Sequence, residues 1–390
     1  MTQASELVKE HHVEREARVT PLELFFDLVF VFAITQVTGM LSGDPTWGGL
    51  LRGLLVLGAL WWAWAAYAWL TNTLDSDDGP VRLAMLGAMS AMLIVSLAVP
   101  EAFDADGVIF GLAYFAVRAL HIALYALAGR GDPDLLGAVL RMTPTATLGP
   151  ALLVGAGFLD GAAQGSLWAV ALAIDYLGVL VGGGKGWRVS PAHFAERHGL
   201  IVIIALGESI VAIGVGAAGL PLDAGVIVAA LLGIGVVAAL WWAYFDVVAI
   251  VAQRRLEGAR GVARAAMARD SYSYLHMPMV AGIVLFAFGL KKALAHVGDS
   301  LGTVAALGLC GGLALYLLAH VAFRLRNVRT LNRHRLVAAV VLLGLFPVAV
   351  ELPALAALAL AAAVCFGLIA YEVIRFREAR ARVRATAVAG

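Results

Sequence analysis

The stretch VIVAALLGIGVVAALWWAYF, from Val226 to Phe245, contains no charged residue. A helix of about 20 apolar residues is long enough to cross the hydrocarbon core of a bilayer, which is about 30 Å thick. A second run, from Ser300 to Phe323, also lacks formal charge. Several such runs in one chain do not fit a soluble core. They indicate a membrane protein with many spans.

The composition agrees with this interpretation. Of the 390 residues, 62% are hydrophobic and only 14% are charged, whereas soluble domains carry about 25% charged residues. The first 18 residues are polar and of mixed charge, which is not typical of a cleaved secretory signal. Cys310 and Cys365 lie in apolar runs, and no Cys/His spacing indicates a metal site. We expect neither a metal nor a cofactor.

Apolar windows and helix breakers predict an all-α polytopic fold with about twelve transmembrane helices. The fifth and eleventh segments are short, and each contains a proline, Pro150 or Pro347. The expected spans are 20–40, 49–70, 82–99, 107–128, 142–159, 166–182, 199–219, 225–251, 274–290, 299–323, 336–350 and 354–374.

Lysine and arginine set the orientation, because cytoplasmic loops of membrane proteins carry most of them. With both termini inside, 24 of the 28 basic residues fall on the cytoplasmic side. Arg52, Lys291 and Lys292 fall outside, and Arg118 lies within a span. This distribution predicts a multi-pass protein of the bacterial inner (cytoplasmic) membrane with both termini in the cytoplasm.

The two halves of the chain resemble each other. LELFFDLVFVFAITQ at 22–36 parallels FAERHGLIVIIALGES at 194–209, and GALWWAWAAY at 58–67 parallels AALWWAYFDV at 238–247. Six spans per half give two parallel repeats, related by an axis along the membrane normal. The predicted segments are a cytoplasmic tail 1–19, a first six-helix repeat 20–182, a cytoplasmic linker 183–198, a second six-helix repeat 199–375 and a basic cytoplasmic tail 376–390.

Ionisable side chains inside predicted spans are the candidate functional residues, because a charge at the bilayer centre costs about 2.5–3.5 kcal/mol. Depth makes Asp27 a candidate partner of Arg118 or His121, and it places Glu208 near the midplane as the first choice for a proton-carrying group. The transport or proton-relay candidates are Glu23, Asp27, Arg118, His121, Asp175, Glu208, Ser209 and Asp246.

A structural role is the alternative for each of these residues, since buried acid–base pairs often only hold helices together. Acids close to the interface can also extend toward water. In the linker we expect His193 and His198 to be solvated and GGGKGWRVS, residues 182–190, to be a flexible connector. The pair Gly308 and Gly312 predicts a close helix contact.

Two segments carry a family resemblance. TPLELFFDLVFVFAITQV at 20–37 and ERHGLIVIIALGESIVAIG at 196–214 resemble the bacterial low-temperature-requirement A (LtrA) family. The resemblance covers nearly the whole chain and implies an integral inner-membrane protein linked to growth in the cold. It supplies no substrate and no set of active-site residues.

A second resemblance is to the two-repeat, six-helix potassium or proton channels of lysosomes and bacteria. Their first helix opens with a Phe-Ser-Asp motif before an apolar run. Phe25, Phe26 and Asp27 are similar here, with Phe26 in place of the serine. The second half departs further, with His198 and Gly199 in that region.

Three classes of function follow from these patterns. The first is a transporter or channel for an ion or small solute, with a link to protons as one form of it and its site near Glu208 or at the segments with Pro150 and Pro347. The second is an intramembrane lipid-modifying enzyme, although no nucleophile elbow or metal motif is present. The third is a membrane sensor or scaffold. The expected partners are membrane lipids, the transported ion or solute and a second copy of the chain; nucleic acid is not expected.

Overall fold

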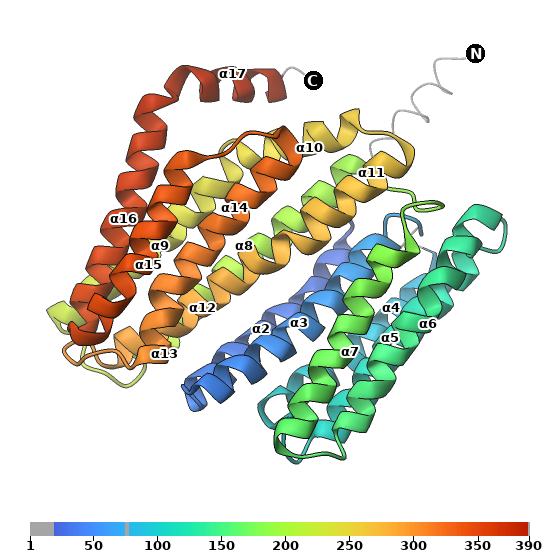
Figure 1. The fold of residues 1–390 in the computed structure, drawn as a ribbon, viewed down its shortest axis with the longest axis horizontal. Coiled ribbons are helices and arrows are strands. Elements are labelled where there is room, and N and C mark those ends of the chain that lie inside the picture. The colour runs from blue at the N-terminus through green and yellow to red at the C-terminus, as the bar shows by residue number, and fades with distance from the viewer. Residues whose placement is uncertain (1–18, 75–77, 389–390) are drawn as a thin grey trace. The chain divides into compact units, whose positions relative to one another are not determined.

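The computed structural model describes residues 19–74 and 78–388, and this part of the chain folds into helices without a β-strand. Ser300 and Pro353 form an isolated β-bridge between two loops. Most of the predicted tail 1–19 lies outside the described residues. The described residues group into two compact units, and the helices are labelled in Figure 1.

The first unit comprises the chain up to Phe30, Trp61–Ile201 and Gln253–Tyr272. Within it α5 packs against α4 and α6, and α6 packs against α7. Its helices are the first part of α2 (Pro21–Gly43), the last part of α3 (Trp47–Leu70), α4 (Gly79–Ala98), α5 (Gly107–Ala128), α6 (Pro133–Ala156), α7 (Gly161–Gly182), the first part of α8 (Pro191–Ala217) and α11 (Gly261–Met267), with a 3₁₀ turn at Val99–Glu101.

The second unit comprises Val31–Leu60, Val202–Ala252 and the chain from Ser273 onward. Here α12 packs against α14, α9 against α16, and α15 against both α14 and α16. Its further helices are α9 (Ala224–Phe245), the first part of α10 (Val248–Gly258), α12 (His276–Ala295), α13 (Thr303–Ala306), α14 (Gly312–Val328), α15 (Arg333–Glu351), α16 (Ala354–Arg375) and α17 (Arg377–Val388), with the end of the π-helical segment Ala268–Tyr274 and the whole π-helical segment Leu307–Gly311.

Glycine permits the contact between α12 and α14. A Cβ atom on Gly282 would lie 2.6 Å from the carbonyl oxygen of Gly312, and one on Gly312 would lie 2.7 Å from that of Gly282. A Cβ atom on Gly308 would lie 2.7 Å from the Phe288 ring. The expected close approach at Gly308 and Gly312 is therefore confirmed, and small residues at helix contacts are typical of membrane bundles.

Eleven helical segments in the described residues are long and apolar enough to cross a membrane. The predicted fifth span corresponds to α6, which has 24 residues but is not among the eleven. Arg141 and three threonines reduce its apolar character, although α6 packs between α5 and α7 like its neighbours. The polytopic α-helical fold is thus established, and the count of twelve stays a prediction.

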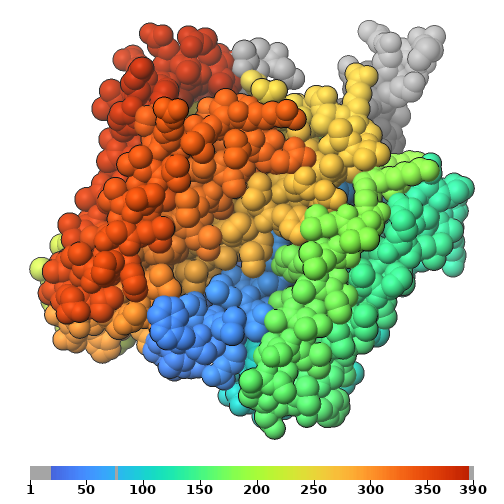
Figure 2. All heavy atoms as spheres, in the orientation of Figure 1, coloured from blue at the N-terminus to red at the C-terminus, as the bar shows by residue number. Residues whose placement is uncertain are grey.

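Large apolar side chains cover much of the outer surface of these helices. Val181 is 88% exposed, Ile374 78% and Leu83 72%. The surface of α15 and α16, coloured orange to red in Figure 2, carries further examples such as Val337 and Leu360. Apolar surface of this extent is expected on helices that face lipid, so the chain is a multi-pass membrane protein.

Several boundaries differ from the sequence-based expectation, among them the start of the fifth span, expected at 142 and found at Pro133. The expected eighth span, 225–251, is divided, since α9 ends at Phe245 and α10 begins at Val248. The expected linker 183–198 is shorter, because α8 already begins at Pro191. The fixed φ of proline suits the first turn of a helix, and this earlier start carries Arg197 and His198 into the bundle.

Candidate functional site

Four acidic side chains are buried inside the bundle. Glu23 and Asp27 on α2 are each 1% exposed, and Asp175 on α7 and Glu208 on α8 are each 2% exposed. All four were expected at membrane depth from the sequence. Three of them form ion pairs with an arginine, whereas the described residues contain no ion pair to Glu208.

Glu23 and Asp27 share one arginine. The guanidinium of Arg197, which is fully buried, lies 3.0 Å from Glu23 Oε1 through NH1 and 2.7 Å from Asp27 Oδ1 through NH2. The two acids are four residues apart, so they lie on the same face of α2. We call Glu23, Asp27, His193 and Arg197 the α2–α8 cluster, and it lies within the first unit.

Further hydrogen bonds fix the α2–α8 cluster. Trp64 donates its indole N–H to Asp27 Oδ1 at 3.0 Å, and His193 Nε2 lies 3.0 Å from Glu23 Oε2. The backbone N–H of Thr20 donates to Glu23 Oε2 at 2.8 Å. Through these ion pairs and hydrogen bonds the cluster joins the starts of α2 and α8.

The α2–α8 cluster corrects the expectation that His193 and His198 are solvated. His193 is 5% exposed, and His198 is completely buried against the rings of Trp64, Phe194 and Tyr272. The error came from the late start assigned to α8. Ser190 followed by Pro191, with polar residues four apart at 193 and 197, is the signal that could have located this helix start.

Arg118 pairs with Asp175. Its NH2 group lies 2.9 Å from Asp175 Oδ1, and both side chains are 3% exposed. The expected pairing of Asp27 with Arg118 or His121 is therefore wrong, because Asp27 pairs with Arg197. His121 is buried between the rings of Tyr67 and Tyr125, at centroid distances of 5.6 and 5.0 Å. Depth along a span does not identify the partner, because the rotation of each helix determines which side chains meet.

Glu208 differs from the other three buried acids. The described residues contain no ion pair to it, and its hydrogen-bond partners are the hydroxyl of Thr35, 2.5 Å from Oε2, and the hydroxyl of Thr38. Lys291 on α12 attracts it electrostatically without forming an ion pair. Glu208, Thr35 and Lys291 all belong to the second unit.

The hydroxyl of Thr35 can serve either protonation state of Glu208. Its oxygen also lies 3.1 Å from the carbonyl oxygen of Val31, and a hydroxyl has one hydrogen to donate and two lone pairs to accept. Toward a carboxylate, Thr35 donates. Toward a neutral carboxylic acid, Thr35 accepts from Glu208 and donates to Val31. The hydrogen bond between Thr35 and Glu208 can therefore persist in both protonation states after a rotation of the hydroxyl.

Ser209, the neighbour of Glu208, is fully buried, and its Oγ finds no hydrogen-bond partner in the described residues. It is not joined to Glu208, so the pair does not resemble an activated nucleophile, which needs a base within hydrogen-bond reach. Asp246 lies directly after α9, where it pairs with Arg380 at 2.7 Å and Arg384 at 3.2 Å.

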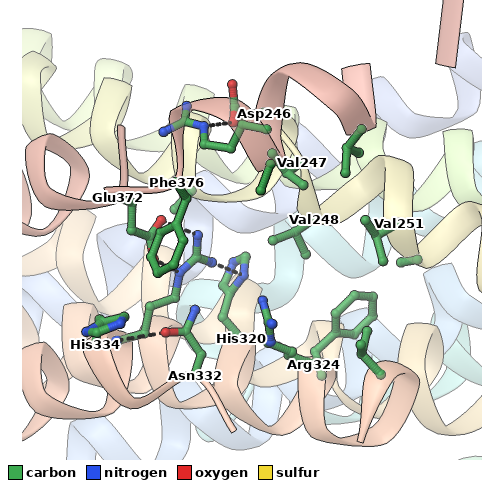
Figure 3. A pocket seen from close by; sticks show the side chains of 18 of the residues that line it. Asp246, Val247, Val248, Val251, His320, Arg324, Asn332, His334, Glu372 and Phe376 are labelled. Carbon is green, nitrogen blue, oxygen red and sulfur yellow. Dashed lines mark hydrogen bonds and ion pairs between the residues drawn. The ribbon is translucent and has the colours of Figure 1, made fainter. Parts of the chain in front are cut away.

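A second group of charges lies at the ends of α14, α15 and α16, in the second unit. Arg335 forms a bidentate pair with Glu372, with Nε–Oε1 and NH2–Oε2 distances of 2.9 Å. Its NH1 donates to His320 Nδ1 at 2.9 Å, as the dashed lines in Figure 3 indicate. These residues line a cavity together with Asp246.

No group of three His, Cys, Asp or Glu side chains in the described part of the chain is arranged to hold a metal ion. Cys310 and Cys365 are buried and free.

The loop at 183–190 is attached to its surroundings: Arg141 donates to the carbonyl oxygens of Gly182 and Lys185 at 3.1 and 2.6 Å. It is thus a packed connector.

Comparison with known proteins agrees with the fold. The family described as bacterial low temperature requirement A protein matches residues 18–370. An uncharacterized protein of Rhizobium meliloti (strain 1021) is 34% identical over 308 residues, which cover 76% of this chain and 74% of that protein. No solved structure matches.

Proposed function

The chain belongs to the bacterial low temperature requirement A family of multi-pass membrane proteins linked to low temperature, and we propose that it is a transporter or channel for an ion or small solute. In this proposal it lies in the bacterial inner membrane and couples movement of its substrate to protons through Glu208. The contrast between Glu208 and the other buried acids carries the proposal.

An acid inside a membrane bundle needs compensation, because an isolated charge costs about 2.5–3.5 kcal/mol at the centre of a span. Arg197 compensates Glu23 and Asp27, and Arg118 compensates Asp175. Each of these three acids is held next to a guanidinium group. In the described residues Glu208 has only the hydroxyls of Thr35 and Thr38 as direct partners, so it can change its charge without breaking an ion pair.

A proton-coupled carrier needs a group of this kind, which is neutral in one step of its cycle and charged in another. Thr35 allows both states, and the attraction from Lys291 lowers the cost of the charged one. The paired residues Glu23, Asp27, Arg118 and Asp175, with His121 packed beside them, then serve as the framework around which the bundle is organised.

The proposal includes the two-repeat organisation with both termini inside. In it α2 and α8 begin equivalent halves, and each supplies a member of the site, Thr35 or Glu208. Binding sites at the interface between repeats are common in secondary transporters. The match between 22–36 and 194–209 in the sequence supports this part.

Purified protein in proteoliposomes tests the role of Glu208. A pH-sensitive dye inside the vesicles reports proton entry when a potassium diffusion potential is imposed. We expect proton entry with the wild-type chain, its loss in Glu208→Gln, and partial retention in Glu208→Asp. Glu351→Gln is the matched control, because Glu351 is an exposed acid on α15. Equal proton entry with wild type and Glu208→Gln would remove Glu208 from the mechanism.

A further inference from the structure

The second unit contains a cavity of about 460 Å³ that is lined by residues of six helices. Its walls come from the junction of α9 and α10, the end of α14, the start of α15, the end of α16 and one face of α17. Figure 3 shows the side chains that project into it. The distribution of basic residues assigns this end of the helices to the cytoplasm.

The lining of this cavity is positively charged. Four arginines and two acids contribute to it, so the excess is two positive charges before either lining histidine is counted. Arg335 is held by Glu372, and Arg380 is held by Asp246. These two ion pairs are buried or nearly buried, and they form part of the cavity wall.

Arg324 and Arg333 carry the excess charge. Neither forms an ion pair with an acid within residues 19–74 and 78–388, and Arg324 Nε donates to the hydroxyl of Thr330 at 3.0 Å. They flank the short loop between α14 and α15, one at the end and one at the start of a helix. Both guanidinium groups can therefore bind a ligand without giving up an acidic partner.

Much of the remaining lining is apolar. It includes Val248 and Val251 on α10, Phe323 on α14, Phe376 after α16 and Trp242 on α9. The guanidinium of Arg380 lies 5.6 Å from the centroid of the Trp242 ring, which fixes α17 against α9. One ligand could thus contact both cationic and apolar side chains of the same cavity.

We propose that this cavity binds the phosphate group of an anionic phospholipid, with Arg324 and Arg333 on the phosphate and the wall formed by Val248, Val251 and Phe323 against the start of an acyl chain. Arginine is suited to phosphate because its planar guanidinium donates two parallel hydrogen bonds. Basic pockets between helices at the cytoplasmic side are a known form of anionic-lipid site. The site uses none of the residues around Glu208, so either proposal can fail alone.

Native mass spectrometry of the delipidated protein in neutral detergent tests the site. Phosphatidylglycerol is titrated against phosphatidylcholine with the same acyl chains, and inorganic phosphate is added as a competitor. We expect preferential binding of phosphatidylglycerol, about fivefold weaker in Arg333→Gln and Arg324→Gln and weaker still in the double variant. Arg377→Gln is the control, because Arg377 is exposed on α17 and does not line the cavity.

A second variant separates lost charge from lost fold. Val248→Trp narrows the cavity while leaving all arginines in place, and it should also weaken phosphatidylglycerol binding. Equal binding of the two lipids by wild type, or unchanged binding by the double arginine variant, would overturn the proposal. Competition by inorganic phosphate at the same concentration as phosphatidylglycerol would overturn the lipid assignment and support a site for soluble phosphate compounds.

Discussion

The two units treat buried acids differently. In the first unit Glu23, Asp27 and Asp175 each have a guanidinium within 3.0 Å. In the second unit Glu208 is equally buried, yet its direct partners are neutral hydroxyls. Burial alone therefore does not mark a functional acid. The partner distinguishes an acid that fixes the fold from one that can exchange a proton.

The largest effect is expected at Arg197. Replacing it by Met leaves Glu23 and Asp27 buried without a cation, and removing one member of a buried ion pair costs about 3–5 kcal/mol. We expect a large loss of folded protein, measured as the thermal unfolding midpoint in detergent. The triple variant Arg197→Met, Glu23→Gln, Asp27→Asn removes all three charges and should recover part of the stability. A single variant as stable as wild type would contradict the structural role.

Arg118 should show a similar but smaller effect, because it compensates one acid and not two. Arg118→Met is expected to cost about 3 kcal/mol, at the lower end for a broken buried pair. The double variant Arg118→Met, Asp175→Leu should be more stable than the single one. The interaction energy from the complete cycle of variants measures the pair directly. An energy near zero would show that the two residues act independently.

Glu208→Gln should hardly change the free energy of unfolding. This prediction tests most clearly whether Glu208 differs from the ion-paired acids. Glutamine keeps the size of the side chain, accepts from or donates to Thr35 and removes a charge that has no ion-pair partner. We expect a change below about 1 kcal/mol in the free energy of unfolding, as is usual when no pair is broken. A loss as large as that of Arg197→Met would assign Glu208 to the framework.

Thr35→Val should change stability about as little as Glu208→Gln does and should change proton movement specifically. It removes the hydroxyl and retains the shape, so about 1 kcal/mol is the expected cost of the lost hydrogen bond. Proton entry into proteoliposomes should slow, because the carboxyl group then loses one of its two hydroxyl partners, Thr35 and Thr38. Thr147→Val on α6 is the comparison variant, because the Thr147 hydroxyl donates to the carbonyl oxygen of Thr143 and not to Glu208. Equal rates for Thr35→Val and wild type would exclude a relay through Thr35.

The sequence predicted the helices well because apolar length decides which segments span a membrane. The expected segments 107–128 and 354–374 nearly coincide with α5 and α16. Prolines 150 and 347 do not end their helices, since neighbouring helices in a membrane bundle can compensate a missing backbone hydrogen bond. The acids Glu23, Asp27, Asp175 and Glu208 were also identified, because charge is rare at that depth.

The partners could not be predicted in the same way. Arg197 was counted among cytoplasmic residues, since a basic residue close to a helix start satisfies the orientation rule whether it faces water or the bundle. Arg118 was placed at the right depth, but its partner depends on helix rotation, which apolar spans of low periodicity do not reveal. Glu208 was chosen for depth alone. The absence of an ion pair to it within the described residues came from the structure.

Infrared difference spectroscopy of the reconstituted protein tests most directly whether Glu208 exchanges a proton. Spectra in acidic and alkaline buffer are subtracted for wild type and for Glu208→Gln. We predict a carbonyl band of a protonated carboxylic acid that appears on acidification in wild type, shifts in heavy water and is missing in Glu208→Gln. Identical difference spectra for the two proteins would show that Glu208 keeps one protonation state, and would contradict its role as the proton-carrying group.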